Sequence, residues 1–438
     1  MAKRRSQLLD ILYSSGPAVA VLKSAAKQRD RGLANDLRYP FLSIVGQTEM
    51  KIALLLALIN RAIGGVLLIG ARGTPKTTAV RGLVDLMPVI ERSTCEYGCE
   101  PEDVYDYGMD GVCSECAHKL GMGDPITAPE VMRLVELPLN ARIDDVVGGL
   151  NERVAMEQHK VMLERGILAQ ADQNLLYIDE VNLLDGLIID AILDAAAQGQ
   201  YTVRRGPMAA TFRSRLTLVG SMNPEEGLLR PQIQDRFGLR VMVRGISNAE
   251  ERMEIYRRSV AYKNKPYKFV SDWLAETDAA MTEVAEARKR LPKVTFDKGV
   301  EKEGIRWIEE LKIDSHRAEM TLFEASRALA AADGRTEVTL DDIRTVAPLA
   351  LRQRQTEIAV EYFEAQEKED KKIKTIIAVD PASKSRKRRA RKSNRSPKSA
   401  PASKTPSTNG QPQKSDPTSD SASKTEDVGQ ITPQSSSQ

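Results

Sequence analysis

A glycine-rich segment in the first quarter of the chain has the spacing of a phosphate-binding loop. It runs as Gly70-Ala71-Arg72-Gly73-Thr74-Pro75-Lys76-Thr77 and continues into Thr78. In the pattern G-x-x-x-x-G-K-[ST], backbone N–H groups at a helix N-terminus face the phosphates, the lysine reaches the β- and γ-oxygens, and the hydroxyl binds Mg²⁺. Pro75 stands where this pattern has glycine, and proline has no N–H to donate. The segment therefore predicts a phosphate cradle that lacks one donor, and a glycine turn without a ligand is the alternative.

Polar residues that could complete such a site follow two apolar runs further along. Asp179 and Glu180 end LLYIDE at 175–180, and Asn223 follows LTLVG in the segment GSMNPEE. In nucleotide hydrolysis, an aspartate at a strand end helps to hold Mg²⁺, and a neighbouring glutamate polarises the attacking water. We assign Asp179, with Thr77, to Mg²⁺ and Glu180 to the water. Asn223 would contact the γ-phosphate or the water, and its alternative is an ordinary turn residue. Together these residues predict ATP and Mg²⁺ as cofactors.

The four cysteines form two closely spaced pairs. Cys95-x3-Cys99 and Cys113-x2-Cys116 can close on one tetrahedral ion through their thiolates. We expect structural zinc, and the alternatives are an iron–sulfur cluster or free structural thiols. His118 could substitute for one ligand, although a polar surface residue is the simpler interpretation. Four cysteines are too few for a disulfide framework, so we expect a reducing, cytoplasmic location.

Short apolar runs place these motifs at the ends of strands. The runs VLLIG at 66–70, LLYID at 175–179 and LTLVG at 216–220 are rich in Val, Ile and Leu and do not alternate with polar residues. Strands of a parallel sheet that is covered on both faces have this composition. Helical patterns lie between them at 77–87 and 183–198. This order predicts an α/β nucleotide-binding core over residues 38–247, with a cysteine-rich insertion at 92–126.

The remaining segments carry no strand pattern. Residues 1–37 have the apolar spacing of a helical extension, and residues 248–365 contain successive amphipathic patterns that predict an all-α second domain. From 371 to 438 the chain has no aromatic residue and is dominated by Ser, Pro, Lys, Thr and Gln. Such a composition buries too little apolar surface to offset the entropy of ordering, so we expect a disordered tail.

Basic residues concentrate in this tail. From Pro381 onward there are twelve Lys and Arg residues against four acids, so the body of the chain is mildly acidic although the whole carries +3. The run KSRKRRARKSNR at 384–395 could meet an acidic partner, an anionic membrane surface or nucleic acid, or it could be a solvated linker. Because no aromatic residue is interleaved, stacking on single-stranded bases is not expected, and we predict no specific nucleic acid.

The composition excludes an integral membrane protein. Hydrophobic residues make up 41% of the chain and charged residues 29%, and no apolar run approaches the ~20 residues that cross a bilayer. We expect no secretory signal at the N-terminus, and the alternative for its basic, weakly amphipathic residues is an organelle transit peptide.

Five segments together resemble the AAA+ ATPase subunit of magnesium chelatase, the smaller motor subunit of the complex that inserts Mg²⁺ into protoporphyrin IX. They are FLSIVGQTEMKIALLLALIN, IGGVLLIGARGTPKTTAVRGL, VELPLNARIDDVVGGL, LLYIDEVNLLD and GSMNPEEGLLRPQIQDRFGLRV. Generic AAA+ proteins do not carry the last of these. The resemblance extends from about Pro40 to Arg354 and implies a P-loop core followed by a helical lid domain. More distant chelatase-type ATPases resemble this chain in carrying a four-cysteine insertion.

This resemblance implies roles for further residues. Asn223 resembles sensor 1, and Arg236 in QDRFG resembles the arginine finger that is supplied to the neighbouring subunit. Arg317 in DSHRAE resembles sensor 2 of the lid. The segment TVRRGPMAATFRSR at 202–215 is similar to the family's β-hairpin that projects into the pore of the ring. A cation supplied in trans would couple hydrolysis to ring assembly, since it stabilises charge on the leaving γ-phosphate.

The activity implied by the resemblance is Mg-ATP hydrolysis by a hexameric-type ring. The ring would act on a separate large porphyrin-binding subunit, with a second AAA+ subunit that carries an integrin-type domain, in chlorophyll and bacteriochlorophyll biosynthesis. The tail resembles the linker that precedes this domain in the larger partner. The alternatives are the motor of a related cobaltochelatase, a chaperone-like AAA+ ATPase that matures another metalloenzyme, and a non-hydrolysing scaffold, which Pro75 would favour.

Overall fold

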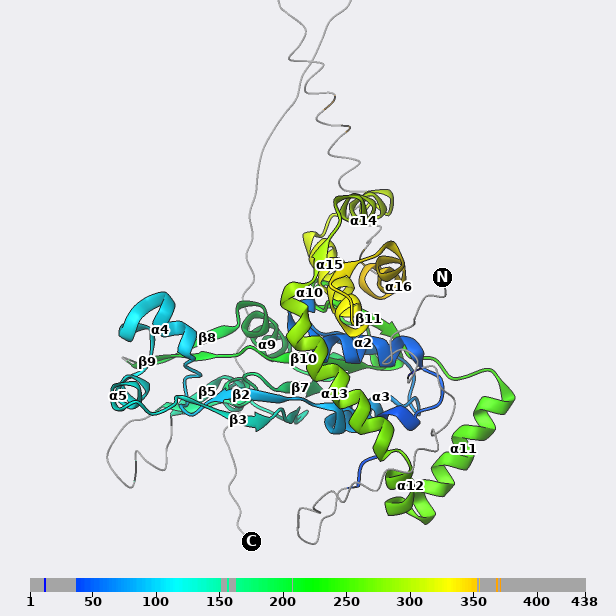
Figure 1. Ribbon diagram of the computed structural model, residues 1–438, viewed down its shortest axis with the longest axis horizontal. Helices are drawn as coiled ribbons and strands as arrows, with labels where there is room; N and C mark the ends of the chain where they lie inside the picture. Colours follow the sequence, from blue (N-terminus) through cyan, green and yellow to red (C-terminus); the bar gives the residue numbers. More distant parts are fainter. Residues whose placement is uncertain are drawn as a thin grey trace, which may run out of the picture. The chain divides into compact units, whose positions relative to one another are not determined.

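The computed structural model describes residues 37–150, 163–206 and 208–352, with the single residues 12, 156, 354, 368 and 371 (Figure 1). The chain divides into two units, Met1–Glu367 and Lys368–Gln438. All helices and strands named below belong to the first unit. The predicted N-terminal extension and the predicted disordered tail lie almost wholly outside the described residues.

A parallel five-stranded sheet forms the core of the first unit. Its strand order is β11-β1-β10-β7-β4, and the strands are β1 Val66–Ile69, β4 Leu134–Leu137, β7 Leu175–Ile178, β10 Thr217–Met222 and β11 Leu239–Met242. Every residue of β1, β7 and β10 is buried. The predicted parallel sheet is therefore confirmed, and the three predicted strands lie side by side at its centre.

Helices cover both faces of this sheet. Val66 and Leu68 of β1 pack in the apolar cluster that contains α2 (Thr48–Ile59), α3 (Lys76–Gly82) and the helices after β11. Leu67 and Ile69 pack in a second cluster with α6 (Ile143–Val147), α8 (Ile167–Gln170) and α9 (Gly186–Gln198). Because successive residues of a strand point to opposite faces, an unbroken apolar run is what this two-sided packing requires.

Three antiparallel strand pairs lie outside the sheet within the described residues. β2 (Val89–Ser93) pairs with β3 (Thr127–Val131), and the cysteine-rich insertion between them contains α4 (Pro101–Tyr107) and α5 (Ser114–Met122). β8 (Gln200–Arg205) and β9 (Met208–Arg213) form a hairpin between α9 and β10. A short pair joins β5 (Gly148–Leu150) to β6 (Leu163–Arg165). Figure 1 shows α4 and α5 at the same end of the unit as the β8–β9 hairpin.

The segment after β11 is helical, as predicted. Its helices within the described residues are α11 Ala249–Asn264, α12 Pro266–Asp272, α13 Leu274–Arg290, α14 Lys298–Glu310, α15 His316–Ala332 and α16 Leu340–Leu351. The structure adds a two-residue parallel pair, β12 Thr295–Phe296 and β13 Glu337–Val338. Thr295, Phe296 and Val338 are β-branched or aromatic, and such residues favour an extended backbone just before α14 and α16 begin. Every helix in the described part of the chain is too short or too polar to cross a bilayer.

Candidate nucleotide site and cysteine cluster

The phosphate loop connects β1 to α3 and depends on two glycines. Gly73 has φ +78°, a left-handed conformation that L side chains rarely adopt. At Gly70, an added Cβ would lie 2.2 Å from the carbonyl oxygen of Val243. Gly70 also donates its N–H to Met222 O at 3.1 Å, which ties the loop to the end of β10. The loop therefore needs glycine for its turn and for its close approach to the neighbouring backbone.

Lys76 is held inside this loop. Its ammonium donates to Gly70 O at 2.6 Å, Ala71 O at 2.9 Å and Thr74 Oγ1 at 3.1 Å. Burial lowers the pKa of Lys76, and the nearby Asp179, among other acids, acts against this shift. A desolvated ammonium that has only neutral oxygens as direct partners gains strongly from phosphate oxygens. The loop thus presents its cation where a phosphate group would bind.

Thr74, Pro75 and Thr78 surround the start of α3. The Thr74 hydroxyl donates to Ala71 O at 2.8 Å and so closes the loop on itself. Pro75 is the N-cap of α3 with φ −79°, and its carbonyl accepts the Ala79 N–H at 2.9 Å. Thr78 is exposed in the first turn of α3. Proline fits this backbone without strain. Its consequence for the motif is therefore the loss of one backbone N–H donor, without a change in the backbone conformation.

The predicted Mg²⁺ ligands meet at the edge of the sheet. Thr77 Oγ1 donates to Asp179 Oδ2 at 3.2 Å, although the two residues are 102 positions apart in the chain. The phenol of Tyr177, a buried side chain of β7, donates to Asp179 Oδ1 at 2.8 Å and to Thr77 Oγ1 at 3.2 Å. The Ser221 hydroxyl also donates to Asp179 Oδ1. A hydroxyl and a hydrogen-bonded carboxylate are oxygen ligands that suit Mg²⁺.

Tyr177 and Ser221 were not identified from the sequence. Tyr177 is the one polar residue in the apolar run of β7 (LLYI), and Ser221 stands in a buried strand without an obvious reason. A buried polar group needs a hydrogen-bond partner. A polar residue inside each apolar run could therefore have indicated a nearby polar site.

Glu180 and Asn223 lie at adjacent strand ends. Glu180 follows β7 in a left-handed conformation (φ 53°), and its N–H donates to Ser221 Oγ at 3.1 Å. Asn223 follows β10 and is only 2% exposed. Its Oδ1 accepts the Glu225 N–H at 3.3 Å, whereas its Nδ2 has no partner among the described residues. An unpaired buried amide donor fits an additional acceptor, such as a γ-phosphate oxygen or the attacking water.

The predicted arginine finger, Arg236, and the predicted sensor 2, Arg317, lie elsewhere. Arg236 ends α10 (Pro231–Arg236) and forms an ion pair with Asp194 of α9. Arg317, in the first turn of α15, has Nη1 3.8 Å from Asp235 Oδ2. Within the described residues, no hydrogen bond or ion pair joins either guanidinium to the phosphate loop or to the acids beside it. The structure therefore does not bring these two arginines to the chain's own candidate site.

Asp235 connects the core to the helices that follow it. Its carboxylate accepts hydrogen bonds from Arg354 Nη1 at 2.7 Å and from the Ser315 hydroxyl at 2.9 Å. The Arg354 side chain is fully buried. Arg317 lies near this network, whereas Arg236, the next residue after Asp235, is paired with Asp194. Sequence reasoning did not identify this role of Asp235.

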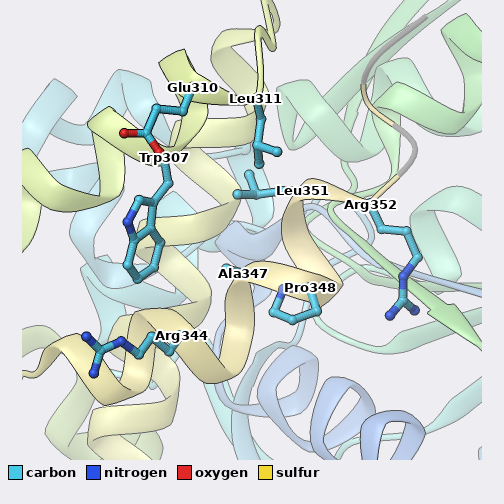
Figure 2. Close-up of a pocket in the computed structure, with 8 residues that line it drawn as sticks. All are labelled: Trp307, Glu310, Leu311, Arg344, Ala347, Pro348, Leu351 and Arg352. Atoms are coloured by element: carbon cyan, nitrogen blue, oxygen red, sulfur yellow. The ribbon is translucent and has the colours of Figure 1, made fainter.

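A hollow of 580 Å³ lies apart from these residues, between α14 and α16 (Figure 2). Its apolar lining includes Trp307, Pro348 and Leu351. None of the residues predicted for nucleotide or metal binding lines it.

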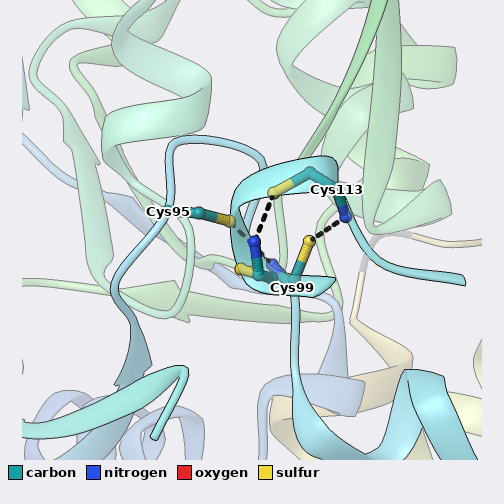
Figure 3. Close-up of side chains that lie close together, drawn as sticks. Cys95, Cys99 and Cys113 are labelled. Carbon is teal, nitrogen blue, oxygen red and sulfur yellow. Dashed lines mark hydrogen bonds between the residues drawn. The ribbon is translucent and has the colours of Figure 1, made fainter. Parts of the chain in front are cut away.

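The four cysteines form one cluster (Figure 3). All four Sγ atoms lie within 4.8 Å of one another, and Cys95, Cys99 and Cys116 are buried. Backbone N–H groups point at the sulfurs: Cys99 N donates to Cys95 Sγ at 3.4 Å and Cys113 N to Cys99 Sγ at 3.3 Å. His118 is exposed and is not a member of the cluster. The two predicted pairs thus form a closed four-sulfur arrangement without the histidine.

Deprotonation of all four thiols in this cluster would require a compensating cation. Burial would raise the pKa of Cys95, but hydrogen bonds from Ser93 and the Cys99 N–H lower it to about 7. Burial raises the pKa of Cys99 to about 12 and also raises that of Cys116. Four thiolates at this spacing repel one another unless a metal ion supplies compensating charge, and a coordinating thiol is deprotonated. All four are free thiols with no disulfide between them.

Comparisons with known proteins agree with this geometry. A family described as an AAA lid domain matches residues 308–376. The chain is 43% identical to the magnesium-chelatase subunit ChlI homolog of Methanocaldococcus jannaschii, over 72% of this chain and 85% of that protein. It is 38% identical to the magnesium-chelatase 38 kDa subunit of Chlorobaculum parvum, over 78% and 98% of the two chains. It is 37% identical to subunit ChlI of Synechocystis, over 78% of this chain and 95% of that protein.

A structure of the complex between subunits BchI and BchD of magnesium chelatase is also similar. The matched chain of that complex is 37% identical in sequence to this chain. The match covers 75% of this chain and 99% of the matched chain, with a TM-score of 0.40. The relatives named above are 37–43% identical to this chain over 72–78% of its length, and the matches cover 85–98% of their own length. The chain therefore belongs to the family of ChlI-type AAA+ ATPase subunits of magnesium chelatase.

Proposed function

We propose that this chain hydrolyses Mg-ATP as the motor subunit of a magnesium chelatase. The observation that carries the proposal is the meeting of Thr77 and Asp179 at 3.2 Å beside Asn223, whose amide donor has no partner within the described part of the chain. Lys76 binds the β- and γ-phosphates, and Thr77 and Asp179 hold Mg²⁺. When bound, Mg²⁺ neutralises charge on the phosphate oxygens.

Glu180 and Asn223 act on the water and on the γ-phosphate. The backbone of Glu180 is anchored to Ser221, the same hydroxyl that donates to Asp179. A carboxylate on such an anchored backbone is placed to orient a water molecule for in-line attack and to accept its proton. Asn223 offers its unpaired Nδ2 from the strand between β1 and β7.

Arg236 serves the site of a neighbouring copy, and Arg317 is the sensor 2 residue of the lid. The Arg236 guanidinium is paired with Asp194 and that of Arg317 lies near Asp235, and neither has a bond to the chain's own phosphate loop among the described residues. A guanidinium supplied from outside stabilises the charge that develops on the transferred phosphoryl group. Hydrolysis then requires a ring of copies, so assembly and turnover are coupled.

The function of the ring is inferred from the names of the relatives, which are magnesium-chelatase subunits. The chain would drive Mg²⁺ insertion into protoporphyrin IX held by a separate large subunit, together with a second AAA+ partner of the kind named BchD. These names favour magnesium over the cobaltochelatase and chaperone alternatives.

Reconstitution tests this function. The chain would be combined with a BchD-type partner and a large porphyrin-binding subunit, and ATP-dependent insertion of Mg²⁺ or Co²⁺ would be followed by porphyrin absorbance. We expect Mg²⁺ insertion that stops with Glu180→Gln. Insertion of Co²⁺ into a corrin-type ring, without Mg²⁺ insertion, would favour the cobaltochelatase assignment.

We further propose that Cys95, Cys99, Cys113 and Cys116 bind structural zinc. Four cysteine sulfurs within 4.8 Å of one another, with N–H groups pointing at them, support a tetrahedral thiolate site. Such a site suits the reducing cytoplasm. Elemental analysis of protein purified under reducing conditions should find about one zinc per chain. A brown protein with visible absorption would instead indicate an iron–sulfur cluster.

A further inference from the structure

The loop that carries the first cysteine pair contacts the β8–β9 hairpin. The ring of Tyr97, between Cys95 and Cys99, stacks on Phe212 of β9 with centroids 5.5 Å apart and an interplanar angle of 11°. Arg213 N donates to Tyr97 O at 3.3 Å. Phe212 is buried. The hairpin therefore packs one of its few buried side chains directly against the cysteine loop.

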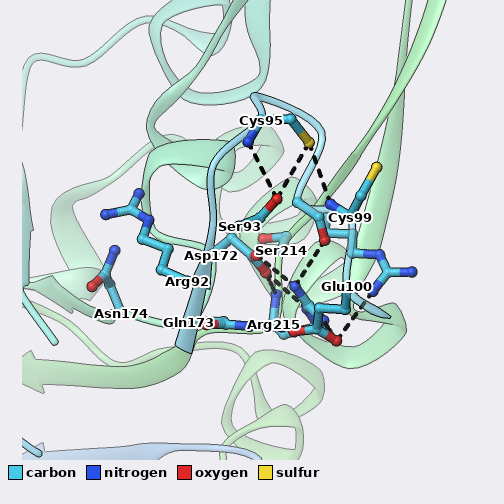
Figure 4. A network of polar contacts seen from close by, with 12 residues as sticks. Arg92, Ser93, Cys95, Cys99, Glu100, Asp172, Gln173, Asn174, Ser214 and Arg215 are labelled. Atoms are coloured by element: carbon cyan, nitrogen blue, oxygen red, sulfur yellow. Dashed lines mark hydrogen bonds and ion pairs between the residues drawn. The ribbon is translucent and has the colours of Figure 1, made fainter. Parts of the chain in front are cut away.

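Charged residues extend this contact to the base of the hairpin (Figure 4). Glu100, which follows Cys99, forms ion pairs with Arg213 (Nη1 to Oε2, 3.4 Å) and with Arg215. Arg213 is also paired with Asp103 of α4. Arg215 Nη2 donates to Gly98 O at 3.2 Å. All of these acceptors lie within four residues of Cys99, so the position of that cysteine sets the position of the network.

The same network reaches the two strands that end at the nucleotide site. Arg215 precedes β10 by two positions and is bound to Asp172 through Nη2 at 2.8 Å and Nε at 3.1 Å. Gln173 precedes β7 by two positions and donates its amide to Glu100. Asp172 is buried. The insertion thus holds the amino ends of β7 and β10, whereas Asp179, Glu180 and Asn223 follow their carboxyl ends.

The insertion has almost no core apart from its cysteines. Its buried cluster consists of Cys95, Cys99, Cys116 and Ile126. So small an apolar cluster does not offset the entropy of ordering about thirty residues. In small metal-dependent segments, the free energy of metal binding supplies the free energy of folding. The order of the network above should therefore depend on the metal.

We infer that zinc at the cysteine cluster fixes the β8–β9 hairpin to the catalytic sheet. The inference rests on the proposed zinc site and adds a role for it. With zinc bound, Glu100, Asp103 and Tyr97 hold the hairpin base rigidly, so that movements of β7 and β10 during ATP turnover are passed to the hairpin. Without zinc, the hairpin moves independently of the nucleotide site.

Amide hydrogen exchange of the full chain tests this inference. Zinc-loaded protein, protein stripped with a chelator, and stripped protein reloaded with Zn²⁺ would be compared peptide by peptide. We expect residues 200–213 to exchange about tenfold faster or more after stripping, which corresponds to the loss of one charge-assisted hydrogen bond. Reloading should restore the protection. ATP affinity should not change, since no hydrogen bond or ion pair among the described residues joins the phosphate loop to the network.

A variant that retains zinc separates the network from the metal. Arg213→Gln removes the pairs with Glu100 and Asp103 and should accelerate exchange of residues 200–213 while zinc content stays at the wild-type level. Arg213→Lys should recover part of the protection, because it keeps one charged donor. The matched control is Arg204→Gln, an exposed arginine of β8, which should leave the exchange unchanged.

The outcomes distinguish the two proposals. A chain that binds no metal would overturn the zinc site and with it the coupling. A chain that binds zinc, loses protection in residues 95–126 on stripping, and keeps full protection in residues 200–213 would overturn the coupling alone. Equal exchange in Arg213→Gln and Arg204→Gln would also overturn it.

Discussion

Replacing Pro75 by glycine or alanine is expected to tighten ATP binding. Pro75 caps α3 with φ −79° and ψ 32°, a backbone that alanine adopts without strain. Its carbonyl bond to the Ala79 N–H would remain in either variant. The change therefore adds one N–H to the phosphate cradle and leaves the loop geometry as it is.

Two effects of opposite sign set the magnitude. A hydrogen bond to a charged phosphate oxygen contributes about 1.5–3 kcal/mol. Losing the stiffness of proline costs about 0.4–1 kcal/mol, because the loop without nucleotide becomes more flexible. The net gain is about 0.5–2.6 kcal/mol, which corresponds to an ATP dissociation constant that is roughly two- to seventy-fold lower. Alanine should gain more than glycine, since it adds less backbone freedom.

Calorimetric titration of ATP in a Glu180→Gln background measures this effect without hydrolysis. Pro266→Ala is the matched control, because Pro266 occupies the first position of α12, where an N–H is not needed. The control should bind ATP as the parent does. If neither Pro75 variant binds ATP more tightly than the parent, the cradle is already satisfied without that donor. Pro75 would then offer no support to a non-hydrolysing scaffold.

The remaining predictions concern catalysis and stability. Lys76→Ala should abolish ATP binding, whereas Glu180→Gln should bind ATP and turn it over very slowly; equal turnover by wild type and Glu180→Gln would contradict the assignment. Arg236→Ala should keep ATP binding and lose about 10³-fold in hydrolysis, with partial recovery when mixed with Glu180→Gln. Mixed rings without recovery would argue against action in trans. Gly70→Ala should lower the free energy of unfolding in urea by about 1–3 kcal/mol, because its Cβ would lie 2.2 Å from a backbone oxygen just past β11. Gly121→Ala in α5, with no atom within 4 Å of its Cβ, is the control and should raise that free energy by about 0.5–1 kcal/mol.

Much of the fold could be predicted because its signals are local. The apolar runs that became β1, β7 and β10 are continuous in sequence, and burial on both faces requires that pattern. The helices after β11 follow from apolar spacing along single segments. The pair β12–β13 was not predicted, because two-residue strands are too short to show a period.

The candidate site residues can be named from the sequence, whereas the residues that hold them in place cannot. Lys76, Thr77 and Asp179 belong to motifs whose chemistry is visible in the residue types. Tyr177 and Ser221 are not part of any such motif, and their importance follows from hydrogen bonds to Asp179. Those bonds depend on the strand order in the sheet, which residue types alone do not specify.

The sequence by itself determined the phosphate loop, the cysteine pairs and the helical segments, because each depends on residues that are neighbours in the chain. Only the tertiary structure decided that Thr77 meets Asp179 across 102 positions and that Arg236 is paired with Asp194 instead of with the phosphate loop. It also decided that the cysteine loop holds the base of the hairpin through Glu100. The physical reason is that burial and strand pairing bring distant segments together, and the same polar side chain could find other partners in another packing.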